Sequence, residues 1–166
     1  MCYSPILAKL QLLTYLPQLK VVKLLVESGA NVYHKNKKGI NAIEQASILA
    51  QQYPASAARL QSIGAFLSGN ELRAIKGWRI TEEWTNWNIA SPEVGKYHKK
   101  VQEVRKSLEN DMLGSGDFPF GGFIVYSKKE NAETIGALLA DAGCPKIVIS
   151  QVLYNPDKDE WEKTDK

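Results

Sequence analysis

The sequence has few of the residues that build metal and disulfide sites. Its 166 residues include two cysteines and two histidines, and their positions lack the spacing of a zinc site. We therefore predict that the protein holds no metal and no cofactor. A disulfide between Cys2 and Cys144 is conceivable, but without an export signal at the start of the chain we expect two reduced thiols.

Long apolar runs and a large excess of one charge are also missing. No run approaches the roughly 18 to 20 apolar residues of a membrane-spanning helix, and residues 1–5 lack the basic and apolar regions of a secretory signal. These absences predict a cytoplasmic protein that does not bind a membrane. The formal net charge of +3 is too small to indicate nucleic-acid binding by itself.

What is present is the composition of a globular protein whose two halves differ. Apolar residues make up 44% of the chain and charged residues 23%, which suits a chain that buries a core. Residues 1–71 contain seven Lys and Arg against three Glu, whereas residues 72–166 contain fourteen against fifteen Asp and Glu, together with all four tryptophans. We therefore expect two domains, a basic one over residues 1–71 and a near-neutral one over residues 72–166.

Apolar residues at helical spacing dominate the first half. Residues 17–29 begin with a proline, repeat apolar residues at steps of three and four, and stop at a glycine, which predicts a short amphipathic helix. A polar turn over residues 36–39 follows, and the next predicted helix covers residues 40–49. Another proline opens a helix over residues 54–70, so this half should be helical throughout.

Stretches of this half resemble the ankyrin repeat family. Residues 21–32, with the sequence VVKLLVESGANV, are similar to the family's second helix and the Gly-Ala-Asp-Val step after it. Residues 36–43, NKKGINAI, stand where the family has Asp-x-x-Gly-x-Thr-Pro-Leu, and residues 4–7 resemble an earlier Thr-Pro-Leu-His. The resemblance covers about residues 4–69 and implies a helical repeat array that binds partner proteins.

The match departs from the family pattern in its length and in one motif. Val22 and Ile63, at equivalent positions, are 41 residues apart rather than about 33, and residues 41–44, NAIE, replace Thr-Pro-Leu-His. Only about two repeats are present, so the array needs a further cap. Either residues 72–166 pack on its last helix, or Met1 begins partway through a longer array.

The second half has the pattern of a small α+β domain with a βαβ unit and a C-terminal hairpin. It begins with a strand or short helix over residues 72–90, followed by a helix over 92–113 with Ser91 as N-cap and a turn at 114–117. A strand over 120–126 comes next, and then a helix opened by a capping box at 127–130 and closed by Gly143. The last predicted elements are a strand over 146–154, a turn at 155–159 and a short strand around Trp161. The whole chain is therefore expected to be α+β, an ankyrin-like helical array followed by a small α/β sandwich.

Part of the second half loosely resembles the ferredoxin-like domain of the family of B-type ribonuclease E regulators. The residues that carry this resemblance are 122–126, with the sequence GFIVY, then 133–143 and the late Trp161. The resemblance implies a regulator of RNA metabolism that acts on a ribonuclease or on RNA.

No set of residues predicts an enzyme. The glycines at 114 and 116 follow a helix and precede a strand, the reverse of a phosphate-binding loop. His98 has no orienting partner, Cys144 has no triad-like context, and the adjacent Glu82 and Glu83 should point apart. Residues 127–129 could hold an anion at a helix start, but a solvated N-cap is the simpler interpretation. We therefore expect no catalytic residues.

The resemblance to ankyrin arrays implies a binding face at the finger-like turn and the helix after it. The candidate partner-binding residues are Tyr33, His34, Lys35, Lys37, Lys38, Glu44 and Gln45. An aromatic residue among lysines suits an acidic protein partner, although an ordinary solvated turn would have the same composition. Nucleic acid is a poorer match because Arg59 is the single arginine of residues 1–71.

The function expected from these observations is a non-enzymatic protein–protein interaction module. The specific hypothesis is an immunity protein, an inhibitor that binds and neutralises a toxin enzyme, and it rests on the small size and the missing catalytic set. The alternative is a regulator of RNA metabolism.

Overall fold

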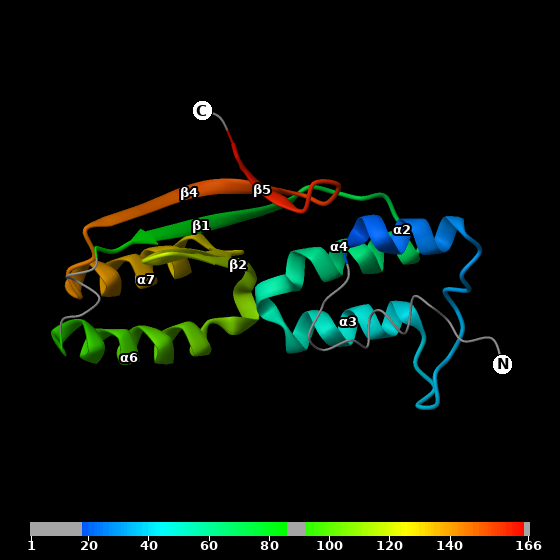
Figure 1. Cartoon of the computed structure of the whole chain (residues 1–166), viewed down its shortest axis with the longest axis horizontal. Helices are drawn as coiled ribbons and strands as arrows, with labels where there is room; N and C mark the ends of the chain where they lie inside the picture. The colour runs from blue at the N-terminus through cyan, green and yellow to red at the C-terminus, as the bar shows by residue number, and fades with distance from the viewer. Residues whose placement is uncertain (1–17, 86–91, 165–166) are drawn as a thin grey trace. The chain divides into compact units, whose positions relative to one another are not determined.

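The computed structural model of the chain describes residues 18–85 and 92–164 (Figure 1). Its helices and antiparallel strands confirm the predicted α+β class. The chain forms two compact units: the first runs to Ile75 and also includes Tyr154–Trp161, and the second comprises Lys76–Leu153 and the chain after Trp161. The return of a late segment to the first unit is not indicated by any local sequence pattern.

The described part of the first unit contains three α-helices, α2 (Leu19–Glu27), α3 (Ala42–Gln52) and α4 (Ala57–Leu67), with a 3-10 turn at Pro54–Ser56 before the last. The predicted helices of this half are thereby confirmed, except that the proline opens a 3-10 turn rather than the α-helix itself. The part of the ankyrin resemblance over residues 4–7 lies outside the described residues.

The core of the first unit explains why these segments are helical. Apolar residues recur every three or four positions along each helix and are almost completely buried, so each helix buries one face. The buried residues are Leu19, Val22, Ala42, Ala46, Leu49, Leu60, Ile63 and Leu67.

A partly buried ion pair holds the turn between the last two strands onto α4. The Arg59 guanidinium donates two hydrogen bonds to the Asp159 carboxylate, with N–O distances of 3.0 and 2.6 Å, and the Tyr154 hydroxyl donates to the same carboxylate. Burial alone would lower the pKa of Arg59, but the hydrogen bond and charge of Asp159 outweigh it and the pKa is raised. The residues of this pair are 100 positions apart, which is why the sequence predicts the turn but not its contact.

Among the residues that the structure describes, the second unit combines most of a sheet with two α-helices. The remaining elements of the chain are β1 (Ile75–Glu83), α6 (Pro92–Ser107), β2 (Met112–Phe118), β3 (Gly121–Tyr126), α7 (Lys129–Asp141), β4 (Lys146–Asn155) and β5 (Glu160–Lys163), with a 3-10 turn at Glu109–Asp111. The end of β4 and the start of β5 belong to the first unit. The sheet is antiparallel with strand order β2-β3-β1-β4-β5. The element order from β1 to β4 is that of the split βαβ, or ferredoxin-like, fold.

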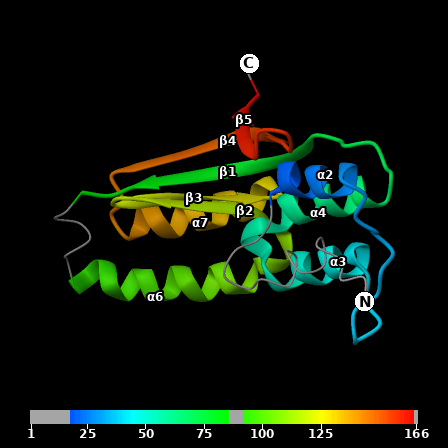
Figure 2. The same cartoon turned by 45° about the vertical axis from the view of Figure 1, so that its right-hand side comes forward.

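The predicted βαβ unit is present, but its strands are not neighbours. β3, α7 and β4 follow one another in the chain as expected, and β1 lies between β3 and β4 in the sheet. Helices α6 and α7 lie on the same side of the sheet (Figures 1 and 2). They cover a core to which Val101, Ile80, Ile124, Tyr126 and Ile135 contribute.

The predicted turn at residues 114–117 is wrong. The helix expected over residues 92–113 ends at Ser107, and residues 112–118 form β2, which pairs with β3. Gly116 serves close packing here, because a Cβ at this position would lie 2.5 Å from the Phe123 ring. Glycine in a strand often marks such an approach, and the sequence does not distinguish this use from a turn.

The capping box predicted at residues 127–130 is also wrong. The N-cap of α7 is Lys128, and its side chain makes no capping hydrogen bond. The start of the helix is held instead by Asp111, whose backbone oxygen accepts the Ser127 N–H at 2.8 Å and whose carboxylate accepts the Asn131 amide at 3.1 Å. Of the two alternatives for residues 72–90, the structure shows the strand, β1; the predicted N-cap Ser91 lies outside the described residues.

Tyr126 provides a test of this core. Its side chain is completely buried, its hydroxyl has no hydrogen-bond partner among the described residues, and burial raises its pKa to about 12 despite the nearby charge of Arg105. Tyr126→Phe removes a buried hydroxyl, so the free energy of unfolding at neutral pH should be unchanged or raised by up to about 1 kcal/mol. Urea unfolding of both proteins measures this.

The same substitution should change the alkaline limb of stability. The pKa of Tyr126 is higher in the folded state than the unfolded value of about 10. The contribution of Tyr126 to the free energy of unfolding is therefore complete below about pH 10 and is lost as the pH rises towards 12. This loss of stability at alkaline pH should be smaller in the Phe variant. Part of the loss that remains comes from Tyr154, whose pKa is also raised by burial and by Asp159. A destabilisation of more than about 1 kcal/mol at neutral pH would contradict the account by showing that the hydroxyl is well paired.

Candidate functional site

The connection between α2 and α3 is a polar loop, and in both views it extends past the end of α3 (Figures 1 and 2). We call residues 31–40 the basic loop. It begins after α2 stops at Gly29, which has a φ of 91° that side chains other than glycine rarely adopt. The Asn31 side chain then accepts the Tyr33 backbone N–H at 2.9 Å, which turns the chain outward.

Asn36 organises the tip of the basic loop. Its side-chain oxygen accepts the backbone N–H groups of Lys38 and Ile40 at 2.8 and 3.1 Å. Its backbone oxygen accepts the Gly39 N–H, and its own N–H donates to the Ile40 oxygen, both at 2.9 Å. Four hydrogen bonds from one residue therefore fix the turn, as short polar side chains commonly do in loops.

A capping box ends the loop and begins α3. The Asn41 side chain accepts the Glu44 backbone N–H, and the Glu44 carboxylate accepts the Asn41 backbone N–H, both at 2.9 Å. Glu44, predicted as a partner-binding residue, therefore has a structural role, although it stays exposed. The Asn-x-x-Glu spacing just before an apolar run is the signal that could have identified this box from the sequence.

The remaining predicted site residues lie on the basic loop or next to it. Tyr33 is 68% exposed, and Lys35, Lys37 and Lys38 are exposed as well, whereas His34 and Gln45 are half-buried. The structure therefore gathers one aromatic side chain and three lysines on the outer surface of one fixed loop.

The charge of the basic loop is not neutralised within the described part of the chain. None of the ion pairs found there includes Lys35, Lys37 or Lys38, and residues 28–43 contain no acidic side chain. The loop therefore presents a concentrated positive charge, which attracts acidic groups over about 8 to 10 Å at physiological ionic strength.

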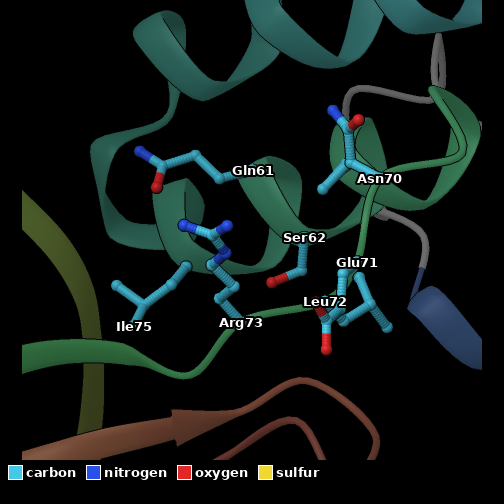
Figure 3. Close-up of a pocket in the computed structure, with 8 residues that line it drawn as sticks. Gln61, Ser62, Asn70, Glu71, Leu72, Arg73 and Ile75 are labelled. Atoms are coloured by element: carbon cyan, nitrogen blue, oxygen red, sulfur yellow. The ribbon is translucent and has the colours of Figure 1, made fainter.

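A second feature of the first unit is a cavity of about 380 Å³ beside α4 (Figure 3). One wall is α4, which contributes Gln61 and Ser62, and the other is the segment of residues 70–75, which contributes Asn70, Glu71 and Arg73. No sequence pattern predicts this cavity, because it forms between a helix and a segment without regular secondary structure.

The residues considered for catalysis take part in other contacts, and the Cys144 thiol donates to the Glu83 backbone oxygen at 3.4 Å. His98 is exposed on α6, where its Nε2 lies 3.4 Å from the side-chain nitrogen of Gln102. Burial raises the pKa of the Cys144 thiol, which disfavours the reactive thiolate. Glu82 pairs with Arg105 and Glu83 with Lys146, so the two neighbouring carboxylates serve separate ion pairs.

Within residues 18–85 and 92–164, no three His, Cys, Asp or Glu side chains come together in a group that could hold a metal ion. The helices of this part of the chain include none that is long and apolar enough to span a membrane. Cys144 has a free thiol, and Cys2 lies outside the described residues.

Comparison of the chain with known proteins found no matching family model, no matching curated protein and no matching solved structure.

Asn36→Ala tests whether this side chain holds the basic loop in place. Losing both hydrogen bonds from Lys38 and Ile40 should lower the free energy of unfolding by about 1 kcal/mol and speed amide exchange across residues 33–40. Hydrogen exchange followed by mass spectrometry measures the second effect. Asn36→Asp is the matched control, because a carboxylate keeps the acceptors; equal exchange in the wild type and the Ala variant would show that Asn36 does not hold the loop.

Proposed function

We propose that the protein is a non-enzymatic protein-binding module whose contact surface is the basic loop. The observation that carries the proposal is the combination of a fixed backbone, an exposed Tyr33 and three unpaired lysines on one loop. The proposed contact residues are Tyr33, Lys35, Lys37 and Lys38, with His34, Glu44 and Gln45 at the border.

A loop of this kind favours binding for two physical reasons. Its backbone is already ordered, so association does not have to supply the free energy of ordering it. Tyrosine contributes a large, stiff contact area, and lysines steer an acidic partner towards the site. The position of the loop, between α2 and the helix pair α3 and α4, is where the resembled ankyrin arrays present their finger tips, which supports the same conclusion.

The partner we propose is a protein with an acidic surface, and the role we propose is inhibition, as in an immunity protein that neutralises a toxin enzyme. Nucleic acid fits the basic loop less well, because its cations are all lysines and Arg59 is held by Asp159. Arginine forms the paired hydrogen bonds that favour phosphate, so a lysine-only loop suits a diffuse acidic protein surface better.

Charge reversal of the loop tests this proposal. Lys35→Glu, Lys37→Glu and Lys38→Glu, combined in one variant, should weaken the complex with the native-host partner by at least about 100-fold, since three attractive contacts become repulsive. The matched control reverses Lys96, Lys99 and Lys100, three exposed lysines of α6, and changes the net charge equally.

Affinity capture from the native host, followed by calorimetry with the captured protein, gives the measurement. The proposal expects a stoichiometric acidic partner that the control retains and the loop variant loses. If both variants retained the partner equally, or no stoichiometric partner were captured, the basic loop would not be the contact surface.

A regulator of RNA metabolism is the second candidate, and the strand order of the second unit favours it. The β-α-β-β-α-β order from β1 to β4 agrees with the ferredoxin-like domain that the resemblance to B-type ribonuclease E regulators implies. A fold is shared by many functions, so this support is at the level of architecture.

RNA titrations at two salt concentrations separate the candidates. An RNA-binding regulator should lose affinity steeply with salt, with a slope proportional to the phosphates it contacts. The protein-binding proposal predicts no saturable RNA binding at physiological salt, and tight, salt-sensitive binding there would favour the second candidate.

A further inference from the structure

The sheet has one face that helices α6 and α7 do not cover. Ile80 of β1 and Ile124 of β3 point into the core beneath these helices, which lie on one side of the sheet (Figures 1 and 2). Because side chains alternate along a strand, the residues on either side of Ile80 and Ile124 point to the opposite face. We call this the open face and define it by Arg79, Thr81, Phe118, Phe123 and Val148.

Two phenylalanine rings lie on the open face. Phe123 is opposite Thr81 of β1 and Gly116 of β2. Phe118 is opposite Gly121 at the next position of the same face. A Cβ at Gly116 would lie 2.5 Å from the Phe123 ring, and a Cβ at Gly121 would lie 2.5 Å from the Phe118 ring, so each ring rests against a glycine of the neighbouring strand. Neither ring belongs to the core beneath the helices, and Phe118 is 38% exposed.

Strand β4 continues the open face on the other side of β1. Ile147 and Ile149 pack against the core beneath the helices, so Val148 between them points to the open face, where it is 39% exposed. At the neighbouring ends of β4 and β1, the Lys146 ammonium lies 3.1 Å from the Glu83 carboxylate, so these two charges balance each other. The open face therefore presents apolar side chains on both sides of β1.

Arg79 is a cation of the open face that no carboxylate balances. Its guanidinium lies 5.9 Å from the centre of the Phe123 ring, which is a cation–π contact. None of the ion pairs between described residues includes Arg79, and its Nε is buried without a hydrogen-bond partner among them. Burial lowers the pKa of Arg79, whereas the pKa of Arg59 is raised because Asp159 compensates its burial. The half-buried Arg79 has therefore lost water without gaining a counter-charge.

These features favour one kind of ligand. A partly dehydrated guanidinium gains most from a carboxylate, which forms paired charge-assisted hydrogen bonds with it. The two rings and Val148 add apolar contact around that pair. Nucleic acid fits less well, because its binding uses several cations and, of the two cations that the described strands place on this face, Lys146 is already paired.

We propose that the open face binds a segment of a partner protein in which a carboxylate is flanked by apolar side chains. The carboxylate binds to the Arg79 guanidinium, and the flanking side chains lie on the Phe118 and Phe123 rings and on Val148. This surface belongs to the second unit, so its existence does not depend on the basic loop or on the partner of that loop.

The test begins with selection of peptides from a phage-displayed library of random sequences, with the full chain as bait. We expect enriched peptides that carry Asp or Glu next to apolar residues. Fluorescence anisotropy of the synthetic peptides then measures their affinity for the wild type and for the variants. Each peptide is also made with Asn or Gln in place of its acidic residue, and this neutral form should bind at least about tenfold more weakly.

Two variants and two controls tie the binding to the open face. Arg79→Gln should weaken binding at least about tenfold by removing the charge-assisted bonds. Phe118→Ala should weaken it about tenfold through lost contact area while Arg79 is kept. Lys76→Gln, which removes an exposed charge of the same strand, should leave the affinity unchanged. The charge-reversed variant of the basic loop should also leave it unchanged, which separates this surface from the loop.

The proposal is overturned if no enriched peptide loses affinity in Arg79→Gln, or if the neutral peptides bind as tightly as the acidic ones. Binding of a single-stranded oligothymidylate that Arg79→Gln abolishes would overturn it as well, by showing that the open face takes nucleic acid. Circular dichroism of each variant confirms that the helices and strands are retained, so that a loss of binding is not a loss of folding.

Discussion

The basic loop depends on the hydrogen bonds of Asn36. Its side-chain oxygen holds two backbone N–H groups, while its backbone closes the turn against Gly39 and Ile40. Fixing a residue of a free chain costs about 1–2 kcal/mol, so a loop already fixed by its own hydrogen bonds meets a partner at a much lower cost. Because these hydrogen bonds fix the backbone, the exposed Tyr33 and the neighbouring lysines form a surface of defined shape.

The charged side chains of the described residues include some that pair within the fold and some that have no partner there. Arg59 and Arg105 lie in partly buried ion pairs with Asp159 and Glu82. Removing one partner of such a pair lowers the stability of the fold, because the other charge is left without its partner. Lys35, Lys37 and Lys38 of the basic loop have no such partners in the described part of the chain. The basic loop belongs to residues 1–71, in which seven Lys and Arg stand against three Glu.

Local patterns predicted the elements well and their contacts poorly. The apolar spacing of residues 17–29 and 54–70 gave the right helices, because one buried face of a helix determines the spacing. Gly114 and Gly116 were predicted to form a turn, but both lie in β2. Gly116 lies against the Phe123 ring, and the sequence alone does not distinguish such a packing glycine from a turn glycine. The basic loop was predictable as polar and basic, but its rigidity comes from the individual hydrogen bonds of Asn36. The cavity and the pair of Arg59 with Asp159 join segments that no local pattern connects.

Backbone nitrogen-15 relaxation of residues 33–40 tests most directly whether the basic loop is a preformed surface. For a preformed loop we expect order parameters close to those of α2 and α3, about 0.85, in the absence of any partner. Order parameters below about 0.6 across these residues would describe a flexible loop and contradict the account.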